Sequence, residues 1–495
     1  MKSFGKHDLN VVAGFTSQST KISASNSAAT NFATDDILTL NAGTLNSLSS
    51  TEERNTLASI LFRANYAYDN KYLLSIGSRW DGSSRFGADN RWGYFPSASL
   101  GWRVSNEDFY NKEAIVNDLK LRASYGATGN NNIGNYKAFA NVSTVGAILG
   151  DATSLGFNSS FYDNPNLGWE RSFSFNGGVD LAFLRNRFTL TVDAYKTKTK
   201  DLLFFQPINT ITGSSGVYVN NGEVKNKGLE FELSAKIIDK TDLKWSLSAN
   251  GAANKNTVSN IGNSTSIISI GDPKRLNYFL AQVGSPLVQF YGYEYDSDIS
   301  VGGNFWPTNV HSDRVIARDV TGDGIVNEKD RVVLGQPTPK FTWGLTNNLK
   351  FKSFDFSFVI QGAQGASVFN ADPNYYETQF SATGTSAYLS LPADLQARTK
   401  YKTESRYSIE NASFVALRNI NLGYTFPANI MKAIKASNLR LYVSAANLWY
   451  KFAKGYSSYN PEGVNEYTDD PLKNGYQRGS APVTRNITFG VNANF

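Results

Sequence analysis

The sequence predicts an all-β protein, namely an antiparallel transmembrane β-barrel with short periplasmic turns and long extracellular loops. Three observations favour this fold class. Apolar and polar residues alternate along many segments, aromatic residues and Gly are abundant without any long apolar run, and short and long connections alternate. Successive side chains of a strand point to opposite faces. A barrel wall has lipid on one face and water on the other, so alternation is the pattern that it requires.

The composition narrows the class further. The 495 residues include 41 Gly, 26 Tyr, 32 Phe and 8 Trp, and Tyr and Trp gather where apolar and wet surroundings meet. Mean hydropathy is −0.34, and no apolar run approaches the ~18 residues of a membrane helix, which excludes an α-helical membrane protein. Cysteine is absent, which argues against disulfide scaffolds, thiolate metal sites and cysteine nucleophiles. The net charge of +6 is scattered along the chain, so nucleic-acid binding has little support.

Five predicted strands lie in the first part of the chain. The second of them places Ile60, Phe62, Ala64 and Tyr66 on one face, and Asp69-Asn70 forms a tight turn into the third. The same reasoning defines all five, which cover residues 7–18, 57–68, 71–80, 94–104 and 119–127.

The alternation is clearest in the middle of the chain, around a turn at Arg185-Asn186. Residues 170–184 carry Phe173, Phe175, Val179, Leu181 and Phe183 at alternate positions, and the next strand begins at Arg187. This hairpin is longer than ordinary globular strands of ~5–6 residues allow. Further strands are predicted at 223–238, 243–256, 340–350, 354–362, 413–426 and 438–450.

The last predicted strand, 483–495, ends on an aromatic residue with no polar tail. Ile487, Phe489, Val491, Ala493 and Phe495 share one face. Taken alone, this stretch fits equally well the buried edge of a soluble sandwich and the closing strand of a barrel. In a barrel, its terminal aromatic residue would lie at the membrane interface.

The connections between these fourteen strands decide between the alternatives. Short turns at 69–70, 185–186, 239–242, 351–353 and 427–437, with an intermediate linker at 105–118, alternate with long loops at 19–56, 81–93, 128–169, 200–222, 257–339, 363–412 and 451–482. Loops of more than ~12–15 residues without regular structure are unusual in compact domains. Here all of them fall at the same end of the strands, which is the asymmetry of outer-membrane barrels.

Short motifs spread over nearly the whole chain carry a family resemblance. They include D-G-S-S-R-F at 81–86, W-G-Y-F-P-S-A-S-L-G-W at 92–102, L-R-A-S-Y-G-A-T-G-N from Leu121, Y-K-T-K-T-K-D-L-L from Tyr195, G-E-V-K-N-K-G-L-E from Gly222, Y-G-Y from Tyr291 and S-F-V-A-L-R-N-I-N-L-G-Y from Ser413. In order and spacing they resemble the C-terminal half of SusC/RagA-like TonB-dependent outer-membrane transporters.

The resemblance implies that residues 1–495 are the C-terminal part of a TonB-dependent receptor β-barrel of about 22 strands. The start of the sequence lacks the apolar core of a signal peptide. We therefore expect signal peptide, TonB box, plug domain and the first strands to lie upstream, and the chain to be inactive alone.

The implied function is active import of oligosaccharides or peptides across the outer membrane of a Gram-negative bacterium. The implied partners are a SusD-like surface lipoprotein, the TonB complex, the barrel-assembly machinery and a glycan or peptide substrate. A siderophore or cobalamin receptor of the same fold, a passive porin or adhesin barrel, and a soluble β-rich glycan-binding protein or glycosidase are the alternatives.

The sharpest local motif is Asp319-Val-Thr-Gly-Asp-Gly-Ile-Val-Asn-Glu-Lys-Asp330, which follows the calcium-loop template with Gly324 at its sixth position. Thr321 and the short Asp330 depart from that template. A structural Ca²⁺ site in the extracellular loop and a metal-free Asx turn both fit. The predicted ligands are Asp319, Thr321, Asp323, the Ile325 carbonyl, Asn327 and Asp330.

Other candidate residues are less specific. Aromatic residues of the loops could stack on sugar or peptide, or pack the loops together; they are Tyr291, Tyr293, Tyr295, Trp306, Tyr375, Tyr376, Tyr456 and Tyr459. We expect the charged residues Asp193, Glu230, Glu232, Lys236 and Arg440 to face the lumen, in solvated pairs or against a plug.

No catalytic constellation is apparent, so we do not expect an enzyme. His7 and His311 are the only histidines, which makes a Ser-His-Asp or multi-His zinc site implausible. Phe489, Val491 and Phe495 of the last strand form the predicted membrane-insertion signal, as the resemblance implies.

Overall fold

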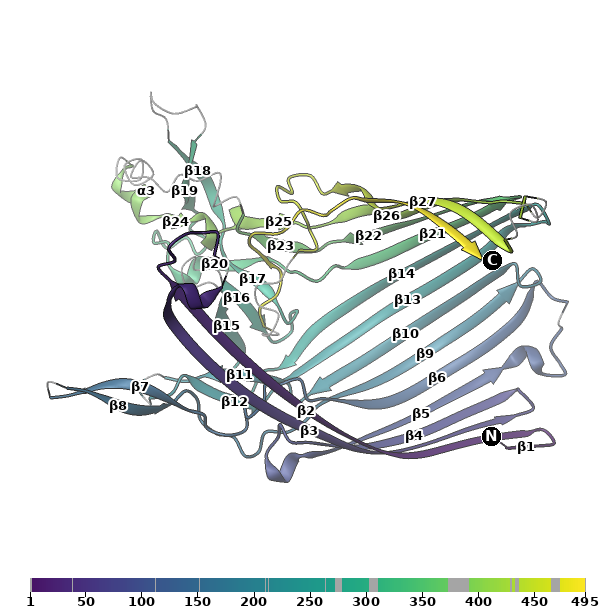
Figure 1. Cartoon of the computed structure of the whole chain (residues 1–495), viewed down its shortest axis with the longest axis horizontal. Coiled ribbons are helices and arrows are strands. Elements are labelled where there is room, and N and C mark those ends of the chain that lie inside the picture. The colour runs from purple at the N-terminus through teal and green to yellow at the C-terminus, as the bar shows by residue number, and fades with distance from the viewer. Residues whose placement is uncertain are drawn as a thin grey trace. The chain divides into compact units, whose positions relative to one another are not determined.

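The computed structural model is built almost entirely of strands (Figure 1). It describes residues 2–494 apart from 38, 112, 151, 210, 212, 263, 272–277, 302–309, 373–390, 428–429, 432–435 and 464–471. Within these residues, no helix is both long enough and apolar enough to cross a membrane.

The main sheet has fifteen strands. Neighbours in the sheet follow one another in the chain, apart from the small strands that the loops insert. In order they are β1 (Lys2–Phe4), β2 (His7–Thr30), β3 (Thr44–Tyr68), β4 (Tyr72–Ser83), β5 (Trp92–Arg103), β6 (Val116–Asn130), β9 (Glu170–Phe183), β10 (Phe188–Lys200), β13 (Glu223–Asp239), β14 (Leu243–Asn260), β21 (Phe341–Phe351), β22 (Phe354–Gln364), β26 (Phe414–Thr425), β27 (Asn438–Phe452) and β29 (Asn486–Asn494). Apart from the short β1, these are the fourteen predicted strands, so that prediction is confirmed.

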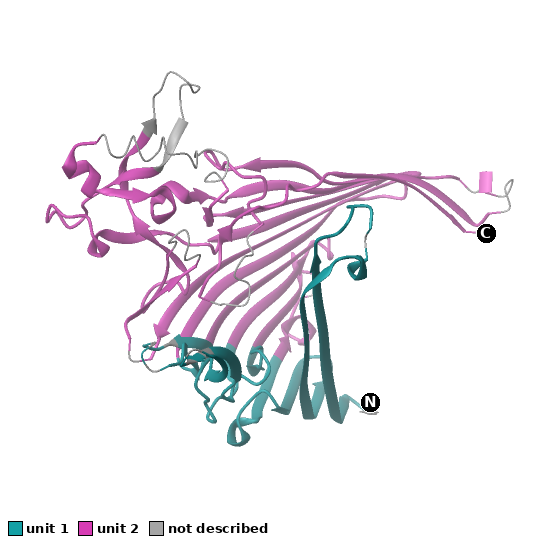
Figure 2. Ribbon diagram, turned by 60° about the vertical axis from the view of Figure 1, so that its left-hand side comes forward, with its two compact units in different colours: residues 1–100, 124–174, 199–221 teal, residues 101–123, 175–198, 222–495 magenta. Residues whose placement is uncertain are grey.

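The chain divides into two compact units (Figure 2). Unit 1 comprises residues 1–100, 124–174 and 199–221, and unit 2 comprises residues 101–123, 175–198 and 222–495. A cluster around Phe86, Leu167 and Trp169 forms the core of unit 1. Among the described residues of unit 2, one core cluster contains Phe290, Phe369 and Tyr476.

The predicted tight turns are confirmed. Asp69 and Asn70 both adopt positive φ in the three-residue connection between the paired Tyr68 and Tyr72, and Leu184, Arg185 and Asn186 do so between β9 and β10. Positive φ at successive residues gives the twist that tight hairpin turns require. In unit 2, backbone hydrogen bonds tie neighbouring turn segments together, from Lys352 to Asp242 at 2.7 Å and from Thr425 to Ser353 at 2.8 Å. The short connections of unit 2 therefore lie at one end of its strands.

One predicted loop is wrong. Residues 19–56 were expected to be irregular, but β2 and β3 continue as a paired ribbon to Thr30 and from Thr44. Nearly every residue of the extension is exposed on both faces. Because neither face is apolar, the sequence there lacks the alternation that marks a strand.

The other long loops are also not irregular, because they carry small strands and helices. Unit 1 contains the hairpins β7 (Val142–Leu149) with β8 (Ala152–Ser159) and β11 (Leu203–Pro207) with β12 (Gly216–Asn220). Within its described residues, unit 2 contains three small sheets. The first is formed by β15 (Ser266–Ile270), β16 (Tyr278–Gln282), β17 (Gln289–Tyr293) and β20 (Arg331–Gly335), and the second by β18 (Tyr295–Val301), β19 (Val310–Ala317) and β24 (Thr399–Tyr401). The third is formed by β25 (Ile409–Asn411), β23 (Ser367–Asn370) and β28 (Tyr476–Gln477). The short helices are η1 (Leu40–Ala42), η2 (Ala88–Asn90), η3 (Val104–Asn106), η5 (Glu328–Asp330), α3 (Ala393–Ala397), η6 (Lys402–Glu404) and η7 (Arg406–Ser408).

The main sheet of unit 2 has an apolar face and a polar face. Directly paired residues lie on the same face, and the register places Phe489 with Val443, and Val491 with Leu441. These apolar side chains are exposed, Phe489 at 77% and Val491 at 63%. Such a continuous exposed apolar face indicates a surface that is covered in the native setting, and lipid covers it in a transmembrane barrel.

Candidate functional site

A row of polar side chains crosses the polar face of unit 2. The register pairs Glu232 with Asn250, Asn250 with Gly344, Gly344 with Gln361, Gln361 with Ala416 and Ala416 with Tyr450. We call Glu232, Asn250, Gln361 and Tyr450 the polar row. The small residues Gly344 and Ala416 between its members leave the amide, carboxylate and hydroxyl groups room to reach a ligand.

A cavity of about 310 Å³ adjoins this row, lined among others by Asn250, Gln361, Phe414 and Glu462. Arg418 links two of the lining residues to Tyr450, because its Nε donates to Gln361 Oε1 at 2.8 Å and its other nitrogens donate to Tyr450 Oη and Glu462 Oε1. The lining combines apolar residues such as Phe414 with the polar side chains of Asn250, Gln361 and Glu462, and convergent polar groups of this kind fix the orientation of a small ligand.

The predicted lumenal charges fall into two groups. Asp193 and Arg440 form ion pairs, whereas Glu230, Glu232 and Lys236 form none with the described residues. The prediction of solvated pairs therefore holds for only two of the five. The unpaired carboxylate of Glu232 lies in the polar row, where it can meet a ligand.

Both ion pairs reach across a neighbouring strand. Arg122 of β6 donates to Asp180 of β9 and to Asp193 of β10, each at 2.9 Å. Arg440 of β27 donates to Asp355 of β22, with Nε to Oδ1 at 3.0 Å. Arg122 was not among the predicted residues, although a basic residue at a polar-face position of a predicted strand is a signal that could have found it.

Glycines in the intervening strands leave room for the side chains of these ion pairs to cross over them. A Cβ atom at Gly178 would overlap Asp193 and Arg122, and one at Gly423 would overlap the guanidinium of Arg440. The ionic side chains therefore lie flat over the backbone of the intervening strand.

We expect Gly178→Val to destabilise the protein by about 1–3 kcal/mol, because the added methyl groups displace the Arg122 ion pairs. Gly177→Val is the matched control, since a Cβ at that adjacent position meets no atom within 4 Å. Unfolding of the purified protein in detergent, followed against denaturant concentration, measures both. Equal midpoints for the two variants would contradict the expectation.

The 319–330 loop is held closed by its own carboxylates. Asp330, fully buried, accepts hydrogen bonds from the backbone nitrogens of Val320 and Thr321 at 3.0 and 2.9 Å and of Asn327 at 2.8 Å. Asp319 accepts from the nitrogens of Gly322 and Gly324 at 2.6 and 2.7 Å. These bonds close the turn around the two carboxylates.

The electrostatics of Asp330 follow from these contacts. Burial raises the pKa of its carboxyl group, but the hydrogen bonds from Thr321, Asn327 and Val320 outweigh that effect and lower the pKa to about 2. The group is therefore ionised at neutral pH. Val326 of the same loop packs against Tyr293 and Ala317, which fixes the loop to the small sheets.

The predicted calcium ligands fit the metal only in part. Gly324 has the positive φ of +82° that the sixth position of a calcium loop requires. Asp323 accepts one bond, from the Ile325 nitrogen at 2.9 Å, and is otherwise exposed. Among the residues that the structure describes, no three Asp, Glu, His or Cys side chains form a metal-binding group by themselves; the predicted ligand set also uses Thr321, Asn327 and the Ile325 carbonyl, so it stays a prediction.

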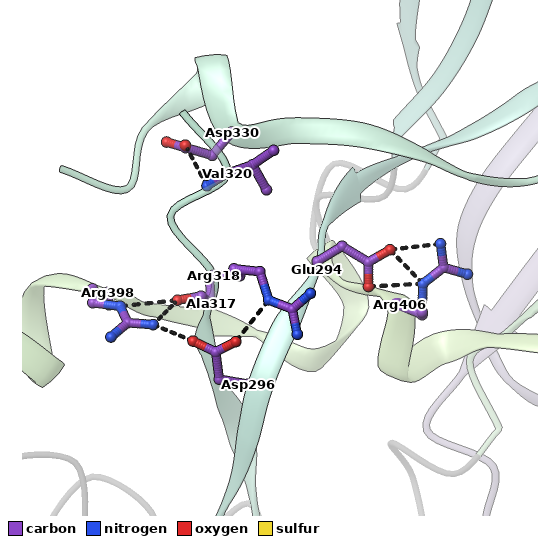
Figure 3. Close-up of polar contacts among 8 residues, drawn as sticks. All are labelled: Glu294, Asp296, Ala317, Arg318, Val320, Asp330, Arg398 and Arg406. Carbon is purple, nitrogen blue, oxygen red and sulfur yellow. Dashed lines mark hydrogen bonds and ion pairs between the residues drawn. The ribbon is translucent and has the colours of Figure 1, made fainter. Parts of the chain in front are cut away.

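Ion pairs join two of the long loops in unit 2 (Figure 3). Arg406 donates to both carboxylate oxygens of Glu294, at 2.6 and 2.8 Å, and Asp296 accepts from Arg318 at 2.8 Å and also from Arg398. The hydrogen bond from Arg318 is the main reason why the pKa of Asp296 is lowered below its ordinary value. Glu294, Asp296 and Arg318 of one loop are thus tied to Arg398 and Arg406 of the other.

The aromatic candidates of the loops differ in how far they are exposed to solvent. Tyr293 is 2% exposed and belongs to the core, so packing is its role. Tyr459 is 58% exposed, while Tyr291, Tyr295 and Tyr456 are half-buried. Three others, Trp306, Tyr375 and Tyr376, lie outside the described residues, as does Phe495 of the predicted insertion signal.

Comparison with known families decides the class of the chain. The family model "TonB dependent receptor-like, beta-barrel" matches residues 3–448. The chain belongs to this TonB-dependent receptor β-barrel family. The fold and family predicted from the sequence are thereby confirmed.

Several curated TonB-dependent receptors are similar to this chain. TonB-dependent receptor P3 of Formosa agariphila is 32% identical over all of this chain and 51% of that relative. TonB-dependent receptor SusC of Bacteroides thetaiotaomicron is 32% identical over 89% of this chain and 44% of that relative. The chain thus spans about half the length of the curated relatives it matches.

Solved structures show the same fold. The RagAB peptide transporter matches with a TM-score of 0.79 over 99% of this chain and 54% of that one, at 23% identity. The chain therefore shares the fold of the matching part of that protein.

Proposed function

We propose that this chain forms much of the wall of an active importer in the outer membrane of a Gram-negative bacterium. The importer takes up oligosaccharides or peptides, captures them with a SusD-like surface lipoprotein and is energised through TonB. The observation that carries this is the polar row with its adjoining cavity, on the polar face of a family barrel. The chain acts only with the remainder of the protein, because it spans about half of its relatives.

The residues support binding rather than covalent chemistry. Amide groups of Asn250 and Gln361, the free carboxylate of Glu232 and the ring of Phe414 suit the hydroxyl groups of a sugar or the backbone of a peptide. TonB-dependent transporters are not enzymes, and we propose no reaction for this chain.

We expect Gln361→Ala combined with Asn250→Ala to lower substrate uptake by about tenfold, since the loss of ~1.4 kcal/mol of binding corresponds to that factor. Uptake of a labelled oligosaccharide or peptide by cells carrying the native full-length gene measures the effect. Thr346→Ala, on the polar face but outside the cavity lining, is the control.

Two outcomes of that assay count against the proposal. Uptake that persists in cells without TonB indicates a passive porin, and uptake only of a siderophore or cobalamin indicates the other receptor class.

We also propose that the 319–330 loop binds Ca²⁺ with the weak affinity of extracellular modules, through Asp319, Thr321, Asp323, Ile325, Asn327 and Asp330. The spacing and the φ of Gly324 support this. The rotation that frees Asp319 and Asp330 from their backbone donors costs part of the binding energy, which places the expected dissociation constant near the 10⁻⁴–10⁻³ M range.

Calorimetric titration of the purified protein with Ca²⁺ tests this proposed site, and we expect Asp323→Ala to abolish the heat of binding. Absence of heat from the native protein at millimolar Ca²⁺ would leave the loop as a metal-free turn.

A further inference from the structure

Three lysine residues form a row across neighbouring strands of unit 2, namely β10, β13 and β14. Lys227 and Lys255 are paired directly in the register of β13 and β14. Lys196 of β10 lines the same hollow, of about 490 Å³, as these two residues. All three residues are exposed. We call Lys196, Lys227 and Lys255 the lysine row.

The lysine row lies on the apolar face of the sheet. Lys227 is two positions before Leu229 and four before Phe231, and both of these apolar side chains are exposed. Because alternate residues of a strand point to the same side, the three side chains share one face. The residues on either side of Lys227, Asn226 and Gly228, are uncharged and belong to the polar face. The positive charge of this segment is therefore confined to the face that carries the apolar side chains.

The row also marks the end of the apolar side chains on that face. Lys196 follows Ala194 along the apolar face of β10, and Lys255 follows Ala253 along that of β14. Both lysines lie toward the long connections, which we expect at the extracellular end of the strands. At the boundary of the apolar band, the long side chain of Lys reaches the level of the lipid headgroups.

The position of these strands in the sheet decides what can cover them. At least five further strands lie on either side of β10, β13 and β14 in the main sheet. The strands that complete a closed barrel are added at the edges of the sheet, and a plug lies against the polar face inside. The apolar face of these three strands is therefore turned outward in the complete barrel as well.

The charge of the lysine row is not balanced by a neighbouring acid. Lys198 and Lys225, two positions further toward the long connections, share Glu223, with Nζ–Oε distances of 2.6 and 3.5 Å. The three members of the row form no ion pair with any residue that the structure describes. Like charges that face each other on neighbouring strands destabilise a sheet. A bound anion between these lysines removes that repulsion.

We propose that the lysine row binds the phosphate groups of a lipid headgroup in the outer leaflet of the membrane. Basic residues beside an apolar membrane face are the usual means of recognising anionic headgroups. The alignment of all three lysines with the end of the apolar band favours a lipid over a soluble anion, which would require no such alignment. This inference goes beyond the import function, because the barrel wall would hold the same lipid whatever the transporter carries.

Binding of purified lipid A, a phosphorylated glycolipid, to the native full-length protein in neutral detergent tests the proposal. Native mass spectrometry measures the bound lipid against its concentration. We expect Lys196→Gln, Lys227→Gln and Lys255→Gln combined to weaken the binding by about tenfold or more, because each Lys near an anionic lipid surface contributes roughly fivefold. Dephosphorylated lipid A should bind to the native protein as weakly as lipid A binds to this variant.

Lys236→Gln, Lys244→Gln and Lys350→Gln combined are the matched control. Lys236 lies four positions after Glu232 of the polar row, and Lys244 lies six positions before Asn250. Lys350 is paired with Lys244, so this variant loses the same charge from the polar face. Its affinity for lipid A should stay within about twofold of the native value. Equal losses in the two triple variants, or equal binding of the dephosphorylated lipid by the native protein, would overturn the proposal.

Thermal unfolding distinguishes the lipid from a free anion. Lipid A should raise the Tm of the native protein but not that of the variant without the lysine row, because a ligand of the folded state stabilises it. A rise with inorganic phosphate equal to that with lipid A would refute the lipid assignment. Lys196→Arg, Lys227→Arg and Lys255→Arg combined keep the charge and should keep the binding. Loss of binding in this variant as well would show that folding rather than charge is affected, and would also refute the assignment.

Discussion

Replacing Phe489 or Val491 with Lys is expected to remove most of the folded protein from the outer membrane. Both side chains are exposed on the apolar face of the last strand, and a Lys at the middle of a bilayer costs about 2–4 kcal/mol in a barrel. The same change damages the segment that we predict as the recognition signal for the barrel-assembly machinery. The fraction that resists unfolding in unheated detergent samples of outer membranes measures the loss.

Thr488→Lys is the matched control for this prediction. Thr488 is adjacent to Phe489 in the same strand, but its side chain lies on the polar face, where it is paired with Ser444. A cation there meets water, so folded protein should reach nearly the wild-type amount. Equal accumulation of Phe489→Lys and Thr488→Lys would show that the exposed apolar face does not meet lipid.

Asp330→Ala should unfold the 319–330 loop while the main sheet remains intact. The substitution leaves the backbone nitrogens of Val320, Thr321 and Asn327 without their acceptor. Val320 and Thr321 lie at exposed positions, so water replaces part of the lost bonding, and a local loss of about 1–3 kcal/mol is expected. Hydrogen exchange at Val320 and Thr321 in the purified protein reports this opening directly.

Asp323→Ala is the comparison, because Asp323 accepts one hydrogen bond at an exposed position. Its exchange rates should stay close to wild type in the absence of calcium. Protection of the Thr321 amide in Asp330→Ala equal to that in the native protein would contradict the role given to this carboxylate.

The strands were predictable because their environment imposes a simple pattern. In β9, Phe173, Phe175 and Val179 alternate with polar residues, as a wall between lipid and water requires. The polar β2–β3 extension has water on both sides and so lacks such a pattern. Sequence alternation therefore identified the strands within the membrane but not their continuation beyond it.

The site was less predictable because it depends on register and on partners distant in the chain. Asn250 and Gln361 are 111 positions apart and meet only through the pairing of β14, β21 and β22. Glu294 meets Arg406 across two loops. Spacing in the sequence shows neither contact, whereas the 319–330 turn was visible because all its donors and acceptors are local.

The core that contains Phe290, Phe369 and Tyr476 draws its residues from three different loops, 257–339, 363–412 and 451–482. The three loops therefore depend on one another for their packing. Exchanging one of them with a relative would set foreign side chains against two native loops, whereas transplanting all three together keeps their shared packing. We therefore expect a change of ligand specificity by loop exchange to succeed only when all three loops are transferred together.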